Sequence, residues 1–289
     1  MKLVLGTAQL GSKYGITNQK KINNIEIKKI VKKIFISKKI NFIDTAFNYG
    51  SSHEVIRKNK LSKLKIITKL KIPSKEPQDL ENYIQKKIES LLAKFRAGSL
   101  HGLMIHEYLD FKKYSSKLLN SLLKLKKRNL VKNIGISVYN KHELNKVLKV
   151  WTPDIIQIPT NVLDQRFTEN NYLDKIKKKN IKIFCRSVFL QGALIGKIDD
   201  LNFDDKNKKI LKKFDKWCSN NKISRLEACI EFVRQQKKID FLVFGINSAT
   251  QLNEVLKSFN YKKKIKITKR FKSNNLNLID PRKWNYDEQ

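Results

Sequence analysis

The chain has 289 residues, of which 40% are hydrophobic, enough to bury a core in one large domain or two ordinary ones. No apolar run approaches the roughly 18 to 20 residues of a membrane-spanning helix, and the apolar start is too short for a signal peptide. The formal net charge is +36, but only nine of the 62 basic residues are Arg. Nucleic-acid readers favour Arg, so we expect most lysines to lie on solvated helix faces, with a polyanion-binding surface as the alternative.

The cysteines and histidines argue against disulfide and metal frameworks. Cys185, Cys218 and Cys229 are odd in number and share no short spacing. The four histidines form no H-x-H or H-E-x-x-H motif. We therefore expect no metal site and a location in the reducing cytoplasm.

Short, continuously apolar runs recur along the chain in the pattern of strands covered on both faces. The eight predicted strands are 3–5, 42–44, 65–68, 103–105, 133–136, 155–158, 181–184 and 241–244. Segments with the 3.6-residue period of amphipathic helices lie between them. The predicted helices are 24–39, 80–95, 114–128, 142–150, 172–180, 206–220, 226–235 and 249–259.

Eightfold alternation of strand and helix predicts an α/β fold, a (β/α)8 TIM barrel. The alternative is a doubly wound open sheet, but the turn 6–11, GTAQLG, lacks the G-x-G-x-x-G spacing that often follows the first strand of such sheets. No Gly/Ser/Pro linker divides the chain. We expect a single domain, with a barrel over 1–260 and an irregular C-terminal tail over 261–289.

Four side chains suited to proton transfer lie at or just beyond the ends of consecutive predicted strands. Asp44 ends the second strand, Tyr49 follows it, Lys69 ends the third and His106 follows the fourth. Active sites of such barrels lie at the carboxyl ends of the strands, where these side chains can converge. Taken singly, Asp44 reads as a turn cap, Lys69 as one lysine among many and His106 as a buried structural histidine; together they predict an active site.

This combination of side chains suits carbonyl chemistry. An ammonium beside a phenol favours the phenolate and lowers the phenol pKa, and a carboxylate keeps that ammonium charged. The phenol then donates its proton to a carbonyl oxygen that gains negative charge, while a histidine orients the carbonyl.

Residues 44–50, DTAFNYG, resemble the D-T-A-x-x-Y-G signature of the aldo/keto reductase superfamily. Weaker matches in the family's order extend the resemblance along nearly the whole barrel. They are LGTAQLG at 5–11, TK at 68–69, His106, IGIS at 134–137, Gln157, CRSVFLQG at 185–192 and GINSATQLNE at 245–254.

The resemblance implies that Tyr49 is the general acid, that Lys69 and Asp44 tune it and that His106 positions the substrate. It implies hydride transfer between a nicotinamide, with NADPH favoured over NADH, and an aldehyde or ketone, for which we expect a sugar or sugar-derived carbonyl. The cofactor-binding residues that it implies are Gly6, Thr7, Ser137, Gln157, Arg186, Ser187, Gly245, Asn247, Gln251 and Glu254. Ser248 and Gln251 also fit a helix capping box.

Four positions depart from the family pattern. His53 stands at the usual Glu, Val138 at a frequent Asn and Arg186 at a frequent aromatic that stacks on the nicotinamide. Asn247 stands where many members carry a Lys or Arg for the 2′-phosphate of NADP. The departures at Val138, Arg186 and Asn247 concern the cofactor side of the site and leave the proton-transfer residues intact.

The sequence leaves other functions open. The main alternative to an enzyme is a reductase-like subunit that senses nicotinamide and regulates a partner with little turnover. Charge-driven nucleic-acid binding is a third hypothesis, and the scattered lysines predict only weak, non-specific binding. Substrate identity, reaction direction and oligomeric state do not follow from the sequence.

Overall fold

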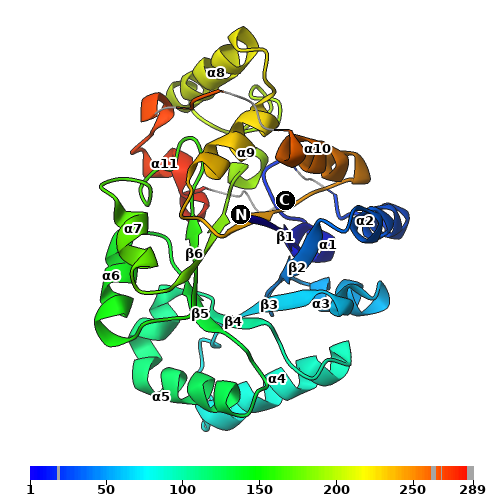
Figure 1. The fold of residues 1–289 in the computed structure, drawn as a ribbon, viewed down its shortest axis with the longest axis vertical. Helices are drawn as coiled ribbons and strands as arrows, with labels where there is room; N and C mark the ends of the chain where they lie inside the picture. The colour runs from blue at the N-terminus through cyan, green and yellow to red at the C-terminus, as the bar shows by residue number, and fades with distance from the viewer. Residues whose placement is uncertain (18–19, 262–264, 268, 285–289) are drawn as a thin grey trace.

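Eight parallel strands pair in chain order and close into a barrel, because β1 pairs with both β2 and β8 (Figure 1). The computed structural model describes residues 1–17, 20–261, 265–267 and 269–284. The helices form a ring around the strands. The fold is the predicted single-domain (β/α)8 barrel, which confirms the fold class and excludes the open sheet.

The strands are β1 Lys2–Gly6, β2 Ile40–Asp44, β3 Lys65–Leu70, β4 Gly102–Ile105, β5 Ile134–Ser137, β6 Ile155–Pro159, β7 Lys182–Arg186 and β8 Phe241–Phe244. The α-helices are α1 Ala8–Gly11, α2 Asn24–Ser37, α3 Ser52–Lys58, α4 Leu80–Phe95, α5 Tyr108–Lys127, α6 Lys141–Val150, α7 Tyr172–Lys177, α8 Asp205–Asn220, α9 Arg225–Gln235, α10 Ala249–Asn260 and α11 Leu276–Ile279. The 3₁₀ turns are η1 Leu61–Lys63, η2 Leu190–Gly192, η3 Lys269–Phe271 and η4 Pro281–Lys283.

The local sequence explains these elements. The strands are apolar on both faces because one face meets the helices and the other fills the barrel. The inner face contributes a separate cluster of Val4, Phe42, Ile67, Met104, Ile155, Phe184, Phe241 and Val243. Helix starts are fixed by side chains that accept the backbone N–H three residues on, which satisfies an otherwise unpaired donor. These caps are Asn23, Asp79, Asn140, Asp204, Ser224 and Ser248.

One clear difference from prediction is the start of α5. The helix begins at Tyr108, six residues before the predicted start at 114, and its backbone is non-helical at Tyr114. The apolar period is clear only beyond this kink. The first turn is held instead by packing of Phe111 and by Asp110, which accepts the backbone N–H of Ile72 at 3.0 Å. These contacts are tertiary and leave no helical period in the sequence.

The C-terminal segment packs on the barrel rather than extending from it. Ile267, Phe271, Leu278 and Ile279 are buried in the main core. In Figure 1, α11 lies on the side of the barrel where α7 and α8 are found. Short helical turns therefore interrupt the tail that we expected to be irregular.

One contact between loops lies at the carboxyl end of the barrel, and we call it the mouth bridge. It joins residues 14–17, after β1, to Gln191 and Gly192, after β7. The backbone N–H of Ile16 donates to Gln191 O at 3.1 Å. A Cβ at Gly15, whose φ is +95°, would lie 2.8 Å from Gln191 O, so the close approach requires glycine.

Candidate active site

A buried ion pair forms the base of the site at the carboxyl ends of β2 and β3. Lys69 Nζ lies 2.6 Å from Asp44 Oδ2, and the Lys69 side chain is 1% exposed. The second oxygen, Asp44 Oδ1, accepts a hydrogen bond from Gln157 Nε2 at 2.8 Å. A buried pair overcomes its desolvation cost only when such additional hydrogen bonds complete it.

Tyr49 stands beside this pair on a tight turn. The Tyr49 backbone N–H donates to Ala46 O at 3.2 Å, and Ser52 N donates to Tyr49 O at 2.9 Å. Gly50 has φ +51°, and Gly11 packs so closely that a Cβ there would lie 2.1 Å from Tyr49 O. The turn that carries Tyr49 can therefore lie this close only because residue 11 has no side chain.

The four predicted proton-transfer residues come together. Lys69 Nζ lies 5.1 Å from the centroid of the Tyr49 ring. The His106 ring meets the same phenol edge-on, with centroids 6.0 Å apart. Strands β2, β3 and β4 are neighbours in the barrel, which is why ends that are far apart in sequence meet here.

The phenol behaves differently from the sequence-based expectation. Burial, and then the charge of Asp44, raises the pKa of Tyr49, while Arg186 opposes that shift. Asp44 already neutralises Lys69 at 2.6 Å, and burial lowers the pKa of the Lys69 ammonium. Tyr49 is therefore protonated at neutral pH, which is the form that a general acid needs.

His106 is a neutral imidazole. Burial, followed by the charges of Lys69 and Arg186, lowers its pKa to about 3. Its Nδ1 is buried and makes no hydrogen bond with the described residues. His53, the first departure from the family pattern, lies outside the site and packs edge-on between Phe47 and Phe95.

A cavity of about 520 Å³ opens beside Tyr49 and runs to the first turns of α10. Of the predicted site residues, those that line it are Gly6, Asp44, Tyr49, Gln157, Arg186, Ser187, Gly245, Asn247, Gln251 and Glu254. The mouth bridge lines the same cavity through Tyr14, Thr17, Gln191 and Gly192.

The other predicted residues lie behind the cavity lining. Thr7 is fully buried, and its hydroxyl donates to Asp44 O at 3.2 Å and accepts from Ser52 Oγ at 3.0 Å. Ser137 is 2% exposed and faces Gln157 in the β5–β6 register. Both residues support the first layer of side chains, as does Lys69, whereas His106 lies beside the Tyr49 ring.

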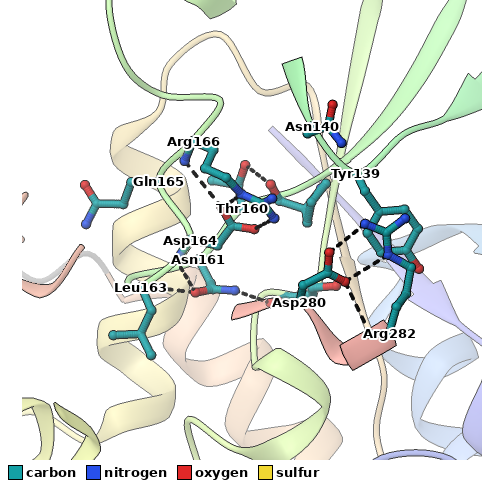
Figure 2. A network of polar contacts seen from close by, with 12 residues as sticks. Tyr139, Asn140, Thr160, Asn161, Leu163, Asp164, Gln165, Arg166, Asp280 and Arg282 are labelled. Atoms are coloured by element: carbon teal, nitrogen blue, oxygen red, sulfur yellow. Dashed lines mark hydrogen bonds and ion pairs between the residues drawn. The ribbon is translucent and has the colours of Figure 1, made fainter. Parts of the chain in front are cut away.

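Arg186, at the end of β7, is held against an aromatic ring from the loop after β5. Its Cζ lies 4.0 Å from the centroid of Tyr139, and Arg282 caps the same ring at 3.5 Å. Asp280 accepts two hydrogen bonds from the Arg282 guanidinium, at 2.9 and 2.6 Å, as Figure 2 shows. The C-terminal segment thus helps to fix a cation that lines the cavity.

The loop after β6 is fixed by its own side chains (Figure 2). Asn161 Oδ1 accepts the backbone N–H groups of Leu163 and Asp164, both at 2.9 Å. Asn161 Nδ2 donates to Ser187 O at 3.0 Å, which ties this loop to the end of β7. Asp164 holds Arg166 through two hydrogen bonds of 2.8 and 2.7 Å. Ser187 therefore rests on a rigid support.

Sequence reasoning missed several residues of the cavity wall, among them Tyr14 and Arg225. Tyr14 lies with its ring centroid 6.4 Å from that of Tyr49. The glycine that follows it, Gly15, suggests a loop at this point of the sequence, but nothing in the sequence shows that the Tyr14 side chain points toward the cavity. Arg225 at the start of α9 also lines the cavity, and no local motif marks it beyond its capping neighbour Ser224.

Two buried polar atoms at the cavity wall make no hydrogen bond with the described residues. They are Arg225 Nη1, a donor, and Asn247 Oδ1, an acceptor. Buried polar groups in folded proteins nearly always have partners. An extended polar ligand that supplies an acceptor at one point and a donor at another, as a dinucleotide does, fits this wall.

Other site types find no support in the described residues. No group of three or more His, Cys, Asp and Glu side chains is placed to hold a metal ion within them. None of the helices in the described ranges is long and apolar enough to cross a membrane.

Comparisons with known proteins agree with this geometry. The family model "Aldo/keto reductase family" matches residues 2–275. An aldo-keto reductase of Bacillus halodurans in its holo form superposes with a TM-score of 0.74 at 15% identity, covering 93% of this chain and 89% of that one. A glycerol dehydrogenase of Gluconobacter oxydans superposes with a TM-score of 0.70 at 20% identity, covering 90% and 87%. No curated protein matches the sequence. The chain belongs to the aldo/keto reductase family.

Proposed function

We propose that this protein is an NAD(P)-dependent oxidoreductase that interconverts a carbonyl and an alcohol, with Tyr49 as the general acid for reduction. The observation that carries the proposal is the buried Asp44–Lys69 pair beside Tyr49 at the end of a long cavity. Family membership supports nicotinamide chemistry and a small-molecule carbonyl substrate.

The bound nicotinamide supplies the hydride. Tyr49 donates its phenolic proton to the carbonyl oxygen, and the buried Lys69 ammonium stabilises the phenolate that remains. Asp44 keeps Lys69 charged and in place, since an unpaired ammonium at this depth would lose its proton. Neutral His106 donates a hydrogen bond to the same carbonyl oxygen without adding a charge.

The proposed cofactor contacts follow the cavity wall. Gln157 and Ser187 lie near the reacting end, and Gly245, Asn247, Gln251 and Glu254 lie near α10. Arg225 Nη1 is suited to a diphosphate oxygen because it is an unpaired donor on a cation. Thr7 and Ser137 act from behind, by holding the Asp44 backbone and the Gln157 strand.

We propose a polyhydroxylated carbonyl compound, such as a sugar or sugar-derived aldehyde, as the substrate class. Polar side chains near Tyr49, among them Tyr14 and Gln191, offer hydrogen bonds to hydroxyl groups. The fold similarity to a glycerol dehydrogenase is consistent with such a substrate.

The test is Tyr49→Phe, assayed with NADH and NADPH against a panel of sugar aldehydes. Removal of the acid lowers kcat by about 10²- to 10⁴-fold, while the cofactor dissociation constant, measured by nicotinamide fluorescence, stays within a factor of two or so. Tyr172→Phe is the matched control, because its hydroxyl bonds to Asn145 at 2.6 Å outside the cavity. Unchanged turnover in Tyr49→Phe removes Tyr49 as the acid, and tight cofactor binding by the unmutated protein without turnover favours the nicotinamide-sensing alternative.

A further inference from the structure

We propose that the protein selects NADH over NADPH, because a carboxylate from α2, that of Glu26, occupies the amino-terminal end of α10, where the adenosine end of the cofactor lies. This inference rests on the proposed function, in which the cavity holds a nicotinamide dinucleotide. It replaces the NADPH preference that the family resemblance implies.

The cavity sets the direction of the cofactor. Tyr49 and Gln157 line one end, and Asn247, Gln251 and Glu254, on the first turns of α10 and just before it, line the other. A nicotinamide that exchanges hydride with a carbonyl held by Tyr49 lies at the first end. The adenosine and its ribose then extend toward α10.

A free helix N-terminus would attract the 2′-phosphate of NADPH, because its unpaired N–H groups and its dipole favour anions. At α10 the protein already supplies acceptors to these groups. Glu26 Oε1 accepts the N–H of Ala249 at 2.6 Å, and Ser248 Oγ accepts that of Gln251 at 3.1 Å. Gln251 Oε1 accepts the N–H of Asn247 at 2.7 Å.

Glu26 reaches this position from a distant part of the chain. It lies in the first turn of α2, 223 residues before Ala249, and α2 and α10 lie side by side in Figure 1. Its second oxygen lies 3.7 Å from Lys29 Nζ, but the Lys29 side chain is 63% exposed, so solvent screens that attraction. The negative charge at the helix end remains.

The charges on the cavity wall point the same way. Glu254 adds a second carboxylate at the α10 end. Of the described residues that line the cavity, only Arg186 and Arg225 are cationic. Arg186 stacks on Tyr139 and its charge acts on Tyr49. The Nε of Arg225 lies 3.0 Å from Asp215, and its Nη2 donates to Gly196 O at 2.7 Å.

These contacts distinguish NADPH from NADH at the 2′ oxygen of the adenosine ribose. A 2′-phosphate carries close to two negative charges, and at the α10 end it would meet the Glu254 carboxylate and a helix end whose N–H groups are already bonded, one of them to the carboxylate of Glu26. The 2′-hydroxyl of NADH can instead donate a hydrogen bond to a carboxylate oxygen. The free Nη1 of Arg225 serves the diphosphate, which both cofactors share, and so does not discriminate.

The experiment is a fluorescence titration of the full-length protein with NADH and with NADPH at physiological ionic strength, repeated by calorimetry. We expect NADH to bind at least about tenfold more tightly than NADPH. Glu26→Gln keeps an oxygen acceptor for Ala249 and removes only the charge, so it shifts the ratio of the two dissociation constants by about tenfold toward NADPH. Glu254→Gln shifts the ratio in the same direction.

Glu81→Gln is the matched control, because Glu81 also lies in a first helical turn and pairs with Lys124 at 2.7 Å, away from the cavity. It leaves the ratio unchanged. Equal or tighter binding of NADPH by the unmutated protein overturns the inference while the proposed function stands. An unchanged ratio in Glu26→Gln also overturns it, since the preference then has another origin. Binding of neither cofactor overturns the proposed function and this inference with it.

Discussion

At the scale of single residues, the Asp44–Lys69 pair is the feature of the site whose loss we expect to cost the most stability. Both side chains are almost wholly buried, and each neutralises the other. Removing one partner leaves an uncompensated charge in the barrel, which is a larger loss than the pair itself is worth.

Lys69→Met therefore lowers the free energy of unfolding by about 3–5 kcal/mol, because it strands the Asp44 carboxylate. Lys71→Met is the control, because the Lys71 side chain is 48% exposed and pairs with Glu107 at the surface. That change costs less than about 1 kcal/mol. Urea denaturation of both variants measures the two losses of stability. Equal midpoints for the two variants would contradict the expected cost of leaving the Asp44 carboxylate unpaired.

His106 links stability to pH. Its pKa in the folded protein is about 3, below the ordinary value of 6.5, because burial disfavours the imidazolium. As pH falls, His106 takes up a proton in the unfolded chain at a higher pH than in the folded protein. The free energy of unfolding is therefore highest above pH 6.5 and decreases as pH falls toward 3. By pH 5 the loss reaches about 2 kcal/mol. His53 and His101 act in the same direction.

The measurement is the free energy of unfolding from pH 7.5 to 5, compared between the parent and His106→Asn. The variant lacks the titrating ring, so its profile is flatter by the contribution of His106. Parallel profiles would contradict the burial effect.

The sequence was sufficient to predict which side chains meet at the mouth, since the residues of DTAFNYG, TK and His106 lie at strand ends that the barrel topology brings together. It did not predict the raised pKa of Tyr49, because the largest cause of that shift is burial, which the sequence does not show. It also did not predict that Glu26 reaches α10, since a contact over 223 residues leaves no local pattern.

At the scale of elements, the glycine turn after β1 supports the turn after β2 that carries Tyr49. Besides its closeness to Tyr49 O, Gly11 accepts the backbone N–H of Ser51 at 3.1 Å, and a Cβ at Gly11 would lie 2.4 Å from Ser52 N. The second glycine of LGTAQLG therefore fixes the position of Tyr49 relative to Lys69.

Gly11→Ala displaces the 49–52 turn, and we expect kcat/KM to fall at least about tenfold and stability to fall by about 1–3 kcal/mol. Gly98→Ala is the control, because a Cβ there meets nothing within 4 Å. Steady-state kinetics and thermal unfolding of the two variants test this; an active Gly11→Ala would show that the turn adjusts.

Element boundaries followed the sequence where apolar periodicity or a cap is local. Strand β8 and helix α4 begin and end where predicted, and Asp79 caps α4. Prediction failed at the start of α5, where Asp110 and Phe111 are held by tertiary contacts and the period is interrupted at Tyr114.

At the scale of the whole molecule, the chain has a formal charge of +36, and many of its lysines lie on the outer helices. Ion pairs such as Lys124–Glu81 and Lys212–Asp199 are exposed and contribute little each. The active-site charges are instead paired within the barrel mouth. The long-range field raises the affinity for any polyanion without selecting one.

We therefore expect duplex DNA to bind weakly at about 0.05 M salt and to be released by about 0.2 M, with equal affinity for unrelated sequences. Fluorescence anisotropy with two labelled duplexes across this range measures it. A sequence preference that persists at the higher salt concentration would indicate a true nucleic-acid site.

The mouth bridge has a consequence for the order and speed of events in turnover. Its residues line the same cavity as Tyr49 and Glu254, so a dinucleotide that reaches both ends lies against the contact between Ile16 and Gln191. Under the proposed function, hydride transfer needs no movement of these loops, whereas exchange of spent cofactor requires them to part. A rapid first turnover followed by a slower steady rate, a pre-steady-state burst, is the kinetic signature of such a gate.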